Sequence, residues 1–295
     1  MNKIFNYISK KVYKSTRPNI ELNSEERIRI AQCCQRSQGN YQKKSDLVIV
    51  LHLYYFDVFD EYFEFLKEVG PFDILISIGD EITIDNMKYI TSKLENVVFF
   101  KFDNVGRDIR PFIKCINFIK DEDYKYLIKL HSKKSPHRVD GDYWRQALTY
   151  SLLGTKEIFS QNISLIDKGF SLICPEGHLF KIDSYWGGNE KIISKIDPIV
   201  NRNISFSFPA GSMYICDFFK IKQFTQYISS TELKFDEEKG QLDGTLAHAI
   251  ERYIGFYFEK NNFLMVESKH KLKTTFRSLA NVKYLCNLFS SILRN

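Results

Sequence analysis

The chain has 295 residues, of which 44% are hydrophobic and 15% aromatic, so it can bury a large core and is not disordered by composition. The formal charge of +6 is carried by the two ends, because residues 1–20 hold five basic residues and residues 268–295 hold six, with no acid in either segment. The middle is therefore net acidic, which argues against a nucleic-acid-binding core and favours tails that meet an anionic surface.

The cysteines and the apolar stretches indicate the compartment. The six cysteines form no CxxC pair and no zinc-ligand spacing, and Cys115, Cys174 and Cys216 lie in apolar patterns, as expected of buried thiols in a reducing compartment. The N-terminus lacks the apolar stretch of a secretory signal, and no apolar run is long enough to span a membrane. These features predict a cytoplasmic protein.

The predicted elements begin after a polar, basic and partly helical segment, 1–45, which ends in a linker-like stretch at 37–45. Apolar strands then alternate with helices, and the first strand is a continuous apolar run typical of a buried parallel strand. The predicted strands are 47–55, 72–78, 96–102 and 124–130, and the helices between them are 56–69, 84–94 and 109–120. This order predicts a mostly parallel, Rossmann-like α/β sheet flanked by helices.

The pattern is less regular after residue 140. It predicts helices at 142–153 and 158–167, strands at 171–174 and 212–216, and a last helix that begins at 243–245. We expect one α/β domain at 46–267, with a basic N-terminal extension at 1–45 and a basic tail at 268–295. Apolar residues spaced by three and four in both ends predict amphipathic helices. Such helices either dock on an anionic membrane, at the inner face of the plasma membrane, or pack on the domain or a second copy.

Polar residues follow each of the four parallel strands, and ligands of such sheets bind at the carboxyl ends of the strands. Gly106 lets a ligand approach the backbone, Arg107 suits a phosphate or carboxylate, and the helix after them offers backbone N–H groups. The candidate residues at these strand ends are His52, Tyr54, Asp80, Asn104, Gly106, Arg107, Asp108, His131, Lys133 and Lys134.

Several of these residues have simpler interpretations. Residues 104–108 are also typical of a turn with a helix cap, His52 of a core histidine, and Lys133 with Lys134 of a solvated turn. No D-x-D motif follows the fourth strand, and the acidic triplet at 121–123 precedes it. We therefore expect a diphosphate site made by lysines, with no metal cofactor, and the less favoured alternative is a divalent metal.

Later segments supply candidates for catalysis and sugar contact. Asp243 is either the N-cap of the last helix or a general base, and Glu238 is a second candidate base. His248, on the same predicted helix, is a candidate for contact with the acceptor sugar. Trp144 with Arg145, and Trp186 in the sequence YWGG, are candidates for sugar contact, although Trp144 on a helix can equally pack in the core.

Six motifs in chain order give the sequence a family resemblance. They are HLYYFD (52–57), NVGRDIRPF (104–112), YLIKLHSKKS (126–135), GDYWRQALTYSLLG (141–154), FPAGSMYICD (208–217) and GQLDGTLAHAIER (240–252). With these motifs the chain resembles the rhamnan synthesis F family of bacterial polysaccharide glycosyltransferases. The resemblance implies a fold similar to the GT-A class of glycosyltransferases.

The resemblance also implies roles. It implies transfer of a sugar from a nucleotide-sugar donor, with dTDP-rhamnose as the expected donor, to a lipid-linked glycan acceptor. The expected reaction is that of an inverting enzyme in O-antigen, capsule or rhamnan synthesis. Residues of the first strand ends would bind the nucleotide, whereas Gly211, Ser212 and Thr245 would line the acceptor side. The alternative is a non-catalytic subunit that binds nucleotide sugar or glycan on the same fold.

Overall fold

A computed structural model describes residues 22–132, 141–240 and 243–269 of the chain. Lys133, Lys134, residues 1–21 and residues 270–295 lie outside this range, and so do the predictions made for them. No helix in the described part of the chain is long and apolar enough to cross a membrane.

The predicted alternation of strands and helices is confirmed. The parallel strands are β1 (Leu47–Leu53), β2 (Asp73–Ile78), β3 (Val97–Lys101) and β4 (Tyr126–His131). The connecting helices are η1 (Phe56–Val58), α3 (Phe59–Leu66), α4 (Ile84–Lys93) and α5 (Ile109–Phe118). Strand β2 is buried along its whole length, because helices cover both faces of a parallel sheet.

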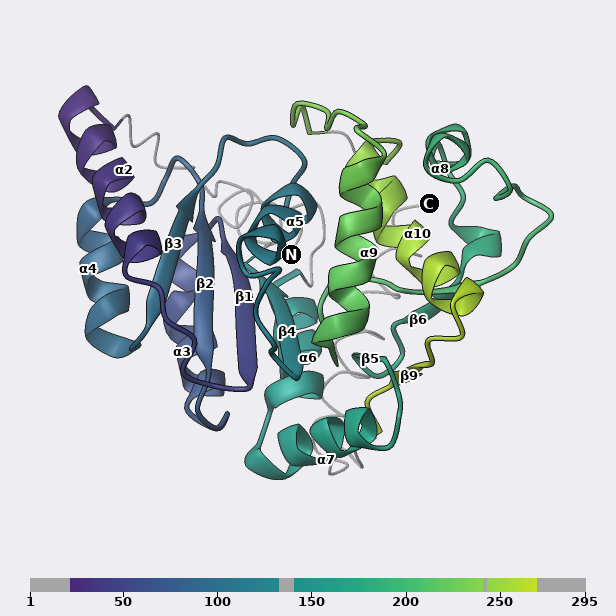
Figure 1. Ribbon diagram of the computed structural model, residues 1–295, viewed down its shortest axis with the longest axis horizontal. Coiled ribbons are helices and arrows are strands. Elements are labelled where there is room, and N and C mark those ends of the chain that lie inside the picture. Colours follow the sequence, from purple (N-terminus) through teal and green to yellow (C-terminus); the bar gives the residue numbers. More distant parts are fainter. Residues whose placement is uncertain (1–21, 133–140, 241–242, 270–295) are drawn as a thin grey trace, which may run out of the picture.

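The strand order explains where a ligand site is expected. Among the described residues the main sheet runs β3-β2-β1-β4-β8-β5-β9. The chain builds from β1 outward to β3 and then returns through α5 to β4, which lies on the other side of β1 (Figure 1). The direction of winding therefore reverses between β1 and β4, and doubly wound folds bind ligands in the crevice at such a point.

The second half of the sheet is antiparallel. Strand β8 (Tyr214–Asp217) pairs antiparallel with β4 and with β5 (Leu172–Cys174), and β9 (Met265–Glu267) lies parallel to β5. A separate small sheet joins β6 (Leu179–Lys181) to β7 (Ser207–Pro209). The predicted strands 171–174 and 212–216 correspond to β5 and β8. Strands β6, β7 and β9 were missed because three residues are too few to show an alternating pattern.

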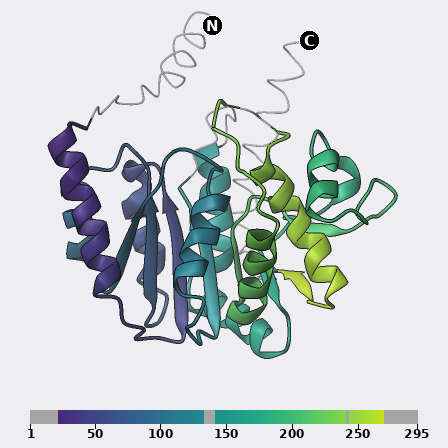
Figure 2. The same ribbon diagram turned by 45° about the horizontal axis from the view of Figure 1, so that its top comes forward.

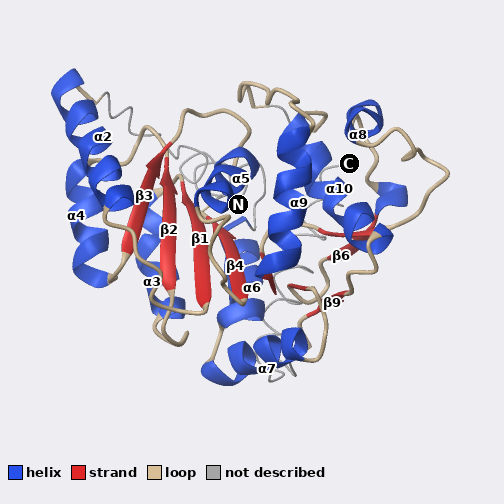
Figure 3. Cartoon of the chain, in the orientation of Figure 1, coloured by secondary structure: helices blue, strands red, loops and turns tan. Residues whose placement is uncertain are grey.

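Helices enclose the sheet on both sides (Figure 3). One apolar cluster packs α5, α9 (Phe218–Ser230) and α10 (Leu246–Lys260) on one face, and these helices lie at the front of the molecule in Figure 2. A second cluster packs α3, α4, α6 (Gly141–Leu153) and α7 (Lys156–Asp167) on the opposite face. The sequence analysis missed α9 and the short α8 (Glu190–Ile196). Asp217, the N-cap of α9, was the available signal, but it is also the last residue of strand β8.

The structure corrects the predicted linker at 37–45. Helix α2 (Ser24–Gly39) includes the first part of it and packs on the edge strand β3 with Ile30 and Cys34 buried. Ser37 Oγ accepts a hydrogen bond of 3.0 Å from Phe99 N, and Gln38 Nε2 donates one of 2.7 Å to Phe99 O. Residues of the predicted extension therefore belong to the packed body and cover an edge strand that would otherwise expose its backbone.

Candidate functional site

A cleft lies at the carboxyl end of β4, one of the two strands between which the winding of the sheet reverses. It has a volume of about 90 Å³ and draws its walls from the loop before α5, the end of β4, helix α6, the turn before β8 and the start of α10. Its lining residues are Arg107, Asp108, Ile109, His131, Trp144, Gly211, Ser212, Ala247, His248 and Glu251. The structure thus brings together predicted site residues from several separate sequence motifs.

Asp108 and Lys129 form a buried charge pair in the wall of the cleft. Lys129 stands in the middle of β4 with only 1% of its surface exposed, and its ammonium group contacts the Asp108 carboxylate. Burial alone raises the pKa of Asp108, but the attraction of Lys129 prevails and holds this pKa well below its usual range. Asp108 is therefore ionised and engaged, and its side chain does not cap α5. Asp108 thus occupies the N-cap position of α5, one of its two predicted roles, without a capping bond from its side chain.

Lys129 also holds the turn before β8. Its Nζ donates hydrogen bonds of 2.7 Å to both Ser212 O and Ser212 Oγ. Ser212 has a φ of +54°, an uncommon conformation for a residue with a side chain, which these two bonds help to maintain. Sequence reasoning missed Lys129. The signal was a lysine inside an apolar strand, since a buried ammonium group needs a partner.

Two histidines end the adjacent central strands. His52 on β1 and His131 on β4 are paired in register, and His52 Nδ1 lies 2.9 Å from Ser77 Oγ. Burial lowers the pKa of His52 to about 4, so this ring is neutral at pH 7. His131 Nε2 lies 2.8 Å from Gly211 O. Because a carbonyl oxygen only accepts, this nitrogen of His131 carries the proton.

The backbone carbonyl and the backbone N–H of Gly211 are both hydrogen-bonded to side chains that line the cleft. His131 donates to its carbonyl oxygen, and its N–H donates to Glu251 Oε1 at 3.0 Å. Gly211 has a φ of +85°, and a Cβ atom there would lie 3.2 Å from the Trp144 ring. Glycine is therefore required for both the turn and the close approach of the tryptophan. Trp144 Nε1 in turn donates to His178 Nε2 at 2.9 Å.

Arg107 at the mouth of the cleft binds a carboxylate of its own chain. Its guanidinium donates to Glu238 Oε1 at 3.1 Å, and its Nε lies 2.6 Å from Glu238 Oε2. Residues 232–240, here called the strap, run past this pair. Glu238 N bonds to Asn104 O, and Gly106 N bonds to Asp236 O. Arg107 and Glu238, predicted as a phosphate ligand and a base, therefore neutralise each other in this structure.

The start of α5 corrects another expectation. Ile109 N and Arg110 N both donate to Gly106 O, at 3.2 and 3.0 Å, and Pro111 has no N–H. The first N–H groups of the helix are thus used locally rather than offered to an anion. Gly106 has a φ of +72°, and a Cβ there would lie 2.6 Å from Phe235. Gly106 therefore allows the backbone of this loop to pack closely against the strap rather than against a ligand.

Asp243 lies just before α10 in the chain and is not among the residues that line the cleft. Its carboxylate accepts from Asn189 Nδ2 at 2.8 Å and from Gly188 N at 3.3 Å, and it lies 3.1 Å from Arg252 Nη2. Partial burial favours a higher pKa of Asp243, but the bond from Asn189 and the charge of Arg252 lower it overall. A carboxylate held in this way is a weak proton acceptor, which speaks against Asp243 as the base.

The N-cap of α10 is Thr245 rather than Asp243. Thr245 and His248 form a capping box, in which Thr245 Oγ1 lies 2.8 Å from His248 Nδ1. Thr245 therefore starts the helix, while His248 both closes the box and lines the cleft.

Other predicted residues are engaged elsewhere. Asp80 is exposed and pairs with Lys101 at 2.7 Å, and Tyr54 packs edge-on against Tyr55. Asn104 is exposed and contributes its carbonyl oxygen to the strap. None of these side chains lines the cleft.

Two of the residues predicted to contact sugar, Arg145 and Trp186, have their partners away from the cleft. Arg145 is 3% exposed and makes a two-point contact with Glu61, with bonds of 3.1 and 2.8 Å, so it joins α6 to α3. Trp186 is buried and packs edge-on against Phe206. Both side chains are held by the fold and neither lines the cleft.

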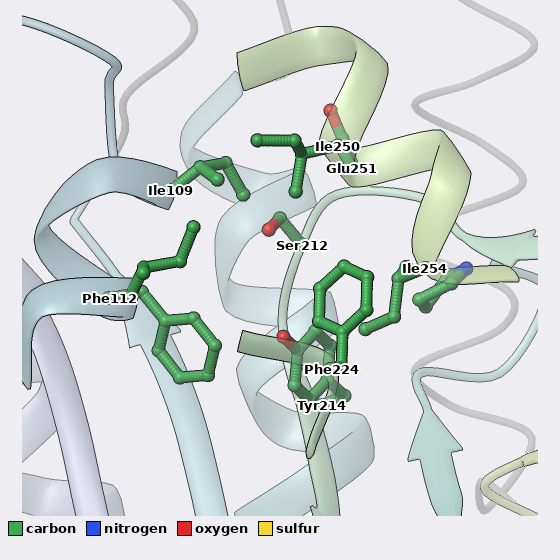
Figure 4. Close-up of a pocket in the computed structure, with 10 residues that line it drawn as sticks. Ile109, Phe112, Ser212, Tyr214, Phe224, Ile250, Glu251 and Ile254 are labelled. Carbon is green, nitrogen blue, oxygen red and sulfur yellow. The ribbon is translucent and has the colours of Figure 1, made fainter. Parts of the chain in front are cut away.

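Glu251 is the functional candidate that the sequence reasoning did not select. It lies three residues after His248, on the same face of α10, and lines both the cleft and a small apolar cavity of about 10 Å³ next to it. Figure 4 shows this cavity, with Ser212 between Ile109 of α5 and Glu251 of α10. In the described part of the chain, no group of three or more His, Cys, Asp or Glu side chains is arranged to hold a metal ion.

The sheet and its cleft define a doubly wound α/β protein with its candidate site at the reversal of strand order. The predicted fold class, a mostly parallel Rossmann-like α/β sheet flanked by helices, is confirmed. The model of the family described as rhamnan synthesis protein F matches residues 5–263, and the chain belongs to this family.

Curated relatives support this membership. The chain is 32% identical over 241 residues to the uncharacterized protein WxcX of Xanthomonas campestris pv. campestris, in strain B100 and in strain ATCC 33913. The matched region covers 80% of this chain and 33% of each relative. The chain therefore spans about a third of the length of these relatives.

Proposed function

We propose that this chain is a glycosyltransferase domain that acts in the synthesis of a rhamnose-containing or related bacterial cell-surface polysaccharide. It would transfer a sugar from a nucleotide-sugar donor, with dTDP-rhamnose as the first candidate, to a lipid-linked glycan acceptor. Membership of the rhamnan synthesis protein F family supports the process. The observation that carries the proposal is the cleft at the carboxyl end of β4, which collects side chains from five separate regions of the fold.

The chemistry of the cleft suits this reaction. A departing nucleoside diphosphate needs positive charge, which Arg107 at the mouth can supply. An acceptor sugar needs a flat apolar surface and polar groups around it, and Trp144 with His248 provides both. A general base is also needed, because the attacking hydroxyl loses its proton during transfer.

The cleft must widen to hold a donor. Its volume of about 90 Å³ lies well below the roughly 300–1,000 Å³ of pockets that hold small-molecule ligands. The strap is the segment whose movement would open it, since it is joined to the cleft through the Arg107–Glu238 ion pair. We propose that the donor diphosphate replaces the Glu238 carboxylate on Arg107, because the same planar group binds both anions.

We also propose that transfer needs no divalent metal. Asp108, an acidic group at the carboxyl end of the third strand, is occupied by Lys129, and this engagement supports the proposal. Turnover should then persist in EDTA, whereas loss in EDTA and recovery with Mn²⁺ or Mg²⁺ would refute the metal-free reaction.

Donor binding tests the proposed site. Thermal unfolding of the purified chain should be measured with dTDP-rhamnose, UDP-glucose and GDP-mannose, since a ligand of the folded state raises the melting temperature. The donor found should bind Arg107→Gln about 10- to 100-fold more weakly, the equivalent of losing ~1.5–3 kcal/mol from a charged hydrogen bond.

Lys101→Gln is the matched control. It removes one positive charge near the same strand end, but Lys101 pairs with Asp80 and does not line the cleft. Equal loss of donor affinity in both variants would indicate a general effect of charge and contradict the assignment of Arg107 to the donor site. Binding by the wild type without release or transfer of the sugar would favour the non-catalytic alternative.

A further inference from the structure

We propose that Glu251 is the general base of the transfer reaction, an inference that rests on the proposed function. Among the described residues that line the cleft, Asp108 and Glu251 are the acidic ones. Asp108 contacts the buried ammonium group of Lys129, and its pKa is held well below the usual range. It therefore cannot keep a proton taken from a hydroxyl group.

The two bases predicted from sequence are also unsuitable. Glu238 binds Arg107, and Asp243 binds Arg252 together with Asn189. Neither Glu238 nor Asp243 is a lining residue of the cleft. A general base must lie within hydrogen-bond reach of the proton it removes, directly or through one water.

Glu251 meets the geometric requirement. It stands in the second turn of α10, in the cleft that also contains His248 and Trp144, the proposed contacts of the acceptor sugar. The Gly211 N–H donates to its Oε1 at 3.0 Å and so fixes the direction of the carboxylate. Gly211 is itself held by His131 through its carbonyl oxygen, so the orientation is transmitted from the central sheet.

The surroundings of Glu251 also suit a base. On one side it borders the small apolar cavity formed with Ile109, Ile250 and Ile254 (Figure 4). Apolar walls keep bulk water away from the carboxylate and strengthen its interactions with a bound hydroxyl group.

The step is then defined atom by atom. The acceptor oxygen forms a bond to the anomeric carbon of the donor while its proton passes to the Glu251 carboxylate. The bond between the anomeric carbon and the diphosphate oxygen breaks, and its electron pair leaves with the nucleoside diphosphate, whose charge Arg107 stabilises. The proton on Glu251 returns to solvent after the products leave. When water replaces the acceptor, the same step is donor hydrolysis.

The test uses the full chain with dTDP-rhamnose, UDP-glucose and GDP-mannose, with release of nucleoside diphosphate as the readout. Glu251→Gln keeps an oxygen that can accept from Gly211 N but cannot take a proton. Its turnover should fall by about 10²- to 10⁴-fold, with donor affinity within about twofold of the wild type. Glu251→Asp should recover part of the turnover, and the acidic limb of the pH–rate profile should be lost in Glu251→Gln.

Glu259→Gln is the matched control. Glu259 lies on the same helix and accepts a hydrogen bond of 2.7 Å from Ser207 N, but it is outside the cleft. Its turnover should equal that of the wild type. A folded Glu251→Gln variant with wild-type turnover would overturn the assignment of the base. A loss of turnover that occurs only in Asp243→Asn would do the same. Either result leaves the proposed function intact. No turnover in the wild type would remove both.

Discussion

Two arginine–carboxylate pairs in this molecule have the same chemistry and different surroundings. Arg145 and Glu61 join α6 to α3 with an arginine that is 3% exposed, whereas Arg107 and Glu238 stand at the mouth of the cleft and are 19% and 18% exposed. Arg145 also binds Asp142, and it occupies a regular helix. Arg107 has a φ of +53° in a loop. The difference indicates that the first pair serves stability and that the second can exchange its partner.

The largest loss of stability is expected from a substitution of Lys129. Its size tests whether burial of an ion pair, rather than its position in the cleft, decides how much free energy of unfolding is lost. Lys129→Met leaves the Asp108 carboxylate without its counter-charge, and removal of one partner of a buried pair costs about 3–5 kcal/mol. Urea denaturation at pH 7 measures this loss. The double variant Lys129→Met with Asp108→Asn should regain part of it, because no charge is then buried alone.

The same pair predicts the pH dependence of stability. The folded-state pKa of Asp108 lies below its unfolded value of about 3.9, so its contribution is fully present above about pH 4. The contribution is lost as the pH falls from there toward the folded-state pKa. The free energy of unfolding should therefore change less between pH 7 and pH 3 in Lys129→Met than in the wild type. An unchanged difference would mean that Lys129 does not set the pKa of Asp108.

The next largest effect is expected at Arg145. Arg145→Met should reduce the free energy of unfolding by about 3 kcal/mol, because it leaves Glu61 partly buried without its partner. Donor affinity of the folded protein should not change. The control Asp142→Asn removes the partner that is 72% exposed and should cost less than about 0.5 kcal/mol. A large loss of donor affinity in Arg145→Met would contradict the assignment of Arg145 to stability alone.

The smallest effect is expected at Glu238. Glu238→Gln weakens the ion pair at the cleft mouth and makes Arg107 more available to a diphosphate, so donor affinity should rise by about two- to fivefold. Calorimetric titration of the donor measures it. Glu237→Gln is the control, since Glu237 is 76% exposed and pairs with Lys239. Weaker binding in Glu238→Gln would show instead that this carboxylate supports the bound state.

The regular half of the fold was predictable for a physical reason. Continuous apolar runs with polar residues at their ends predict buried parallel strands, and β1 to β4 lie where this pattern placed them. The antiparallel half was harder to predict, because strands of three residues carry almost no periodic signal and their pairing depends on segments far away in the sequence. The termini lie outside the described residues, and membrane docking by the basic tails remains a prediction.

The sequence by itself determined the α/β class, the family and the residue types that gather at the strand ends. Only the tertiary structure decided the partners of those residues. Ser212 meets Lys129 across 83 positions and Glu238 meets Arg107 across 131, and no local pattern encodes such distances. Charged groups in a cleft pair with whichever partner the packing brings near, because an unpaired charge in a poorly solvated place costs about 3–5 kcal/mol. For this reason Asp243 and Arg145 became supports of the fold, and Glu251 became the candidate base.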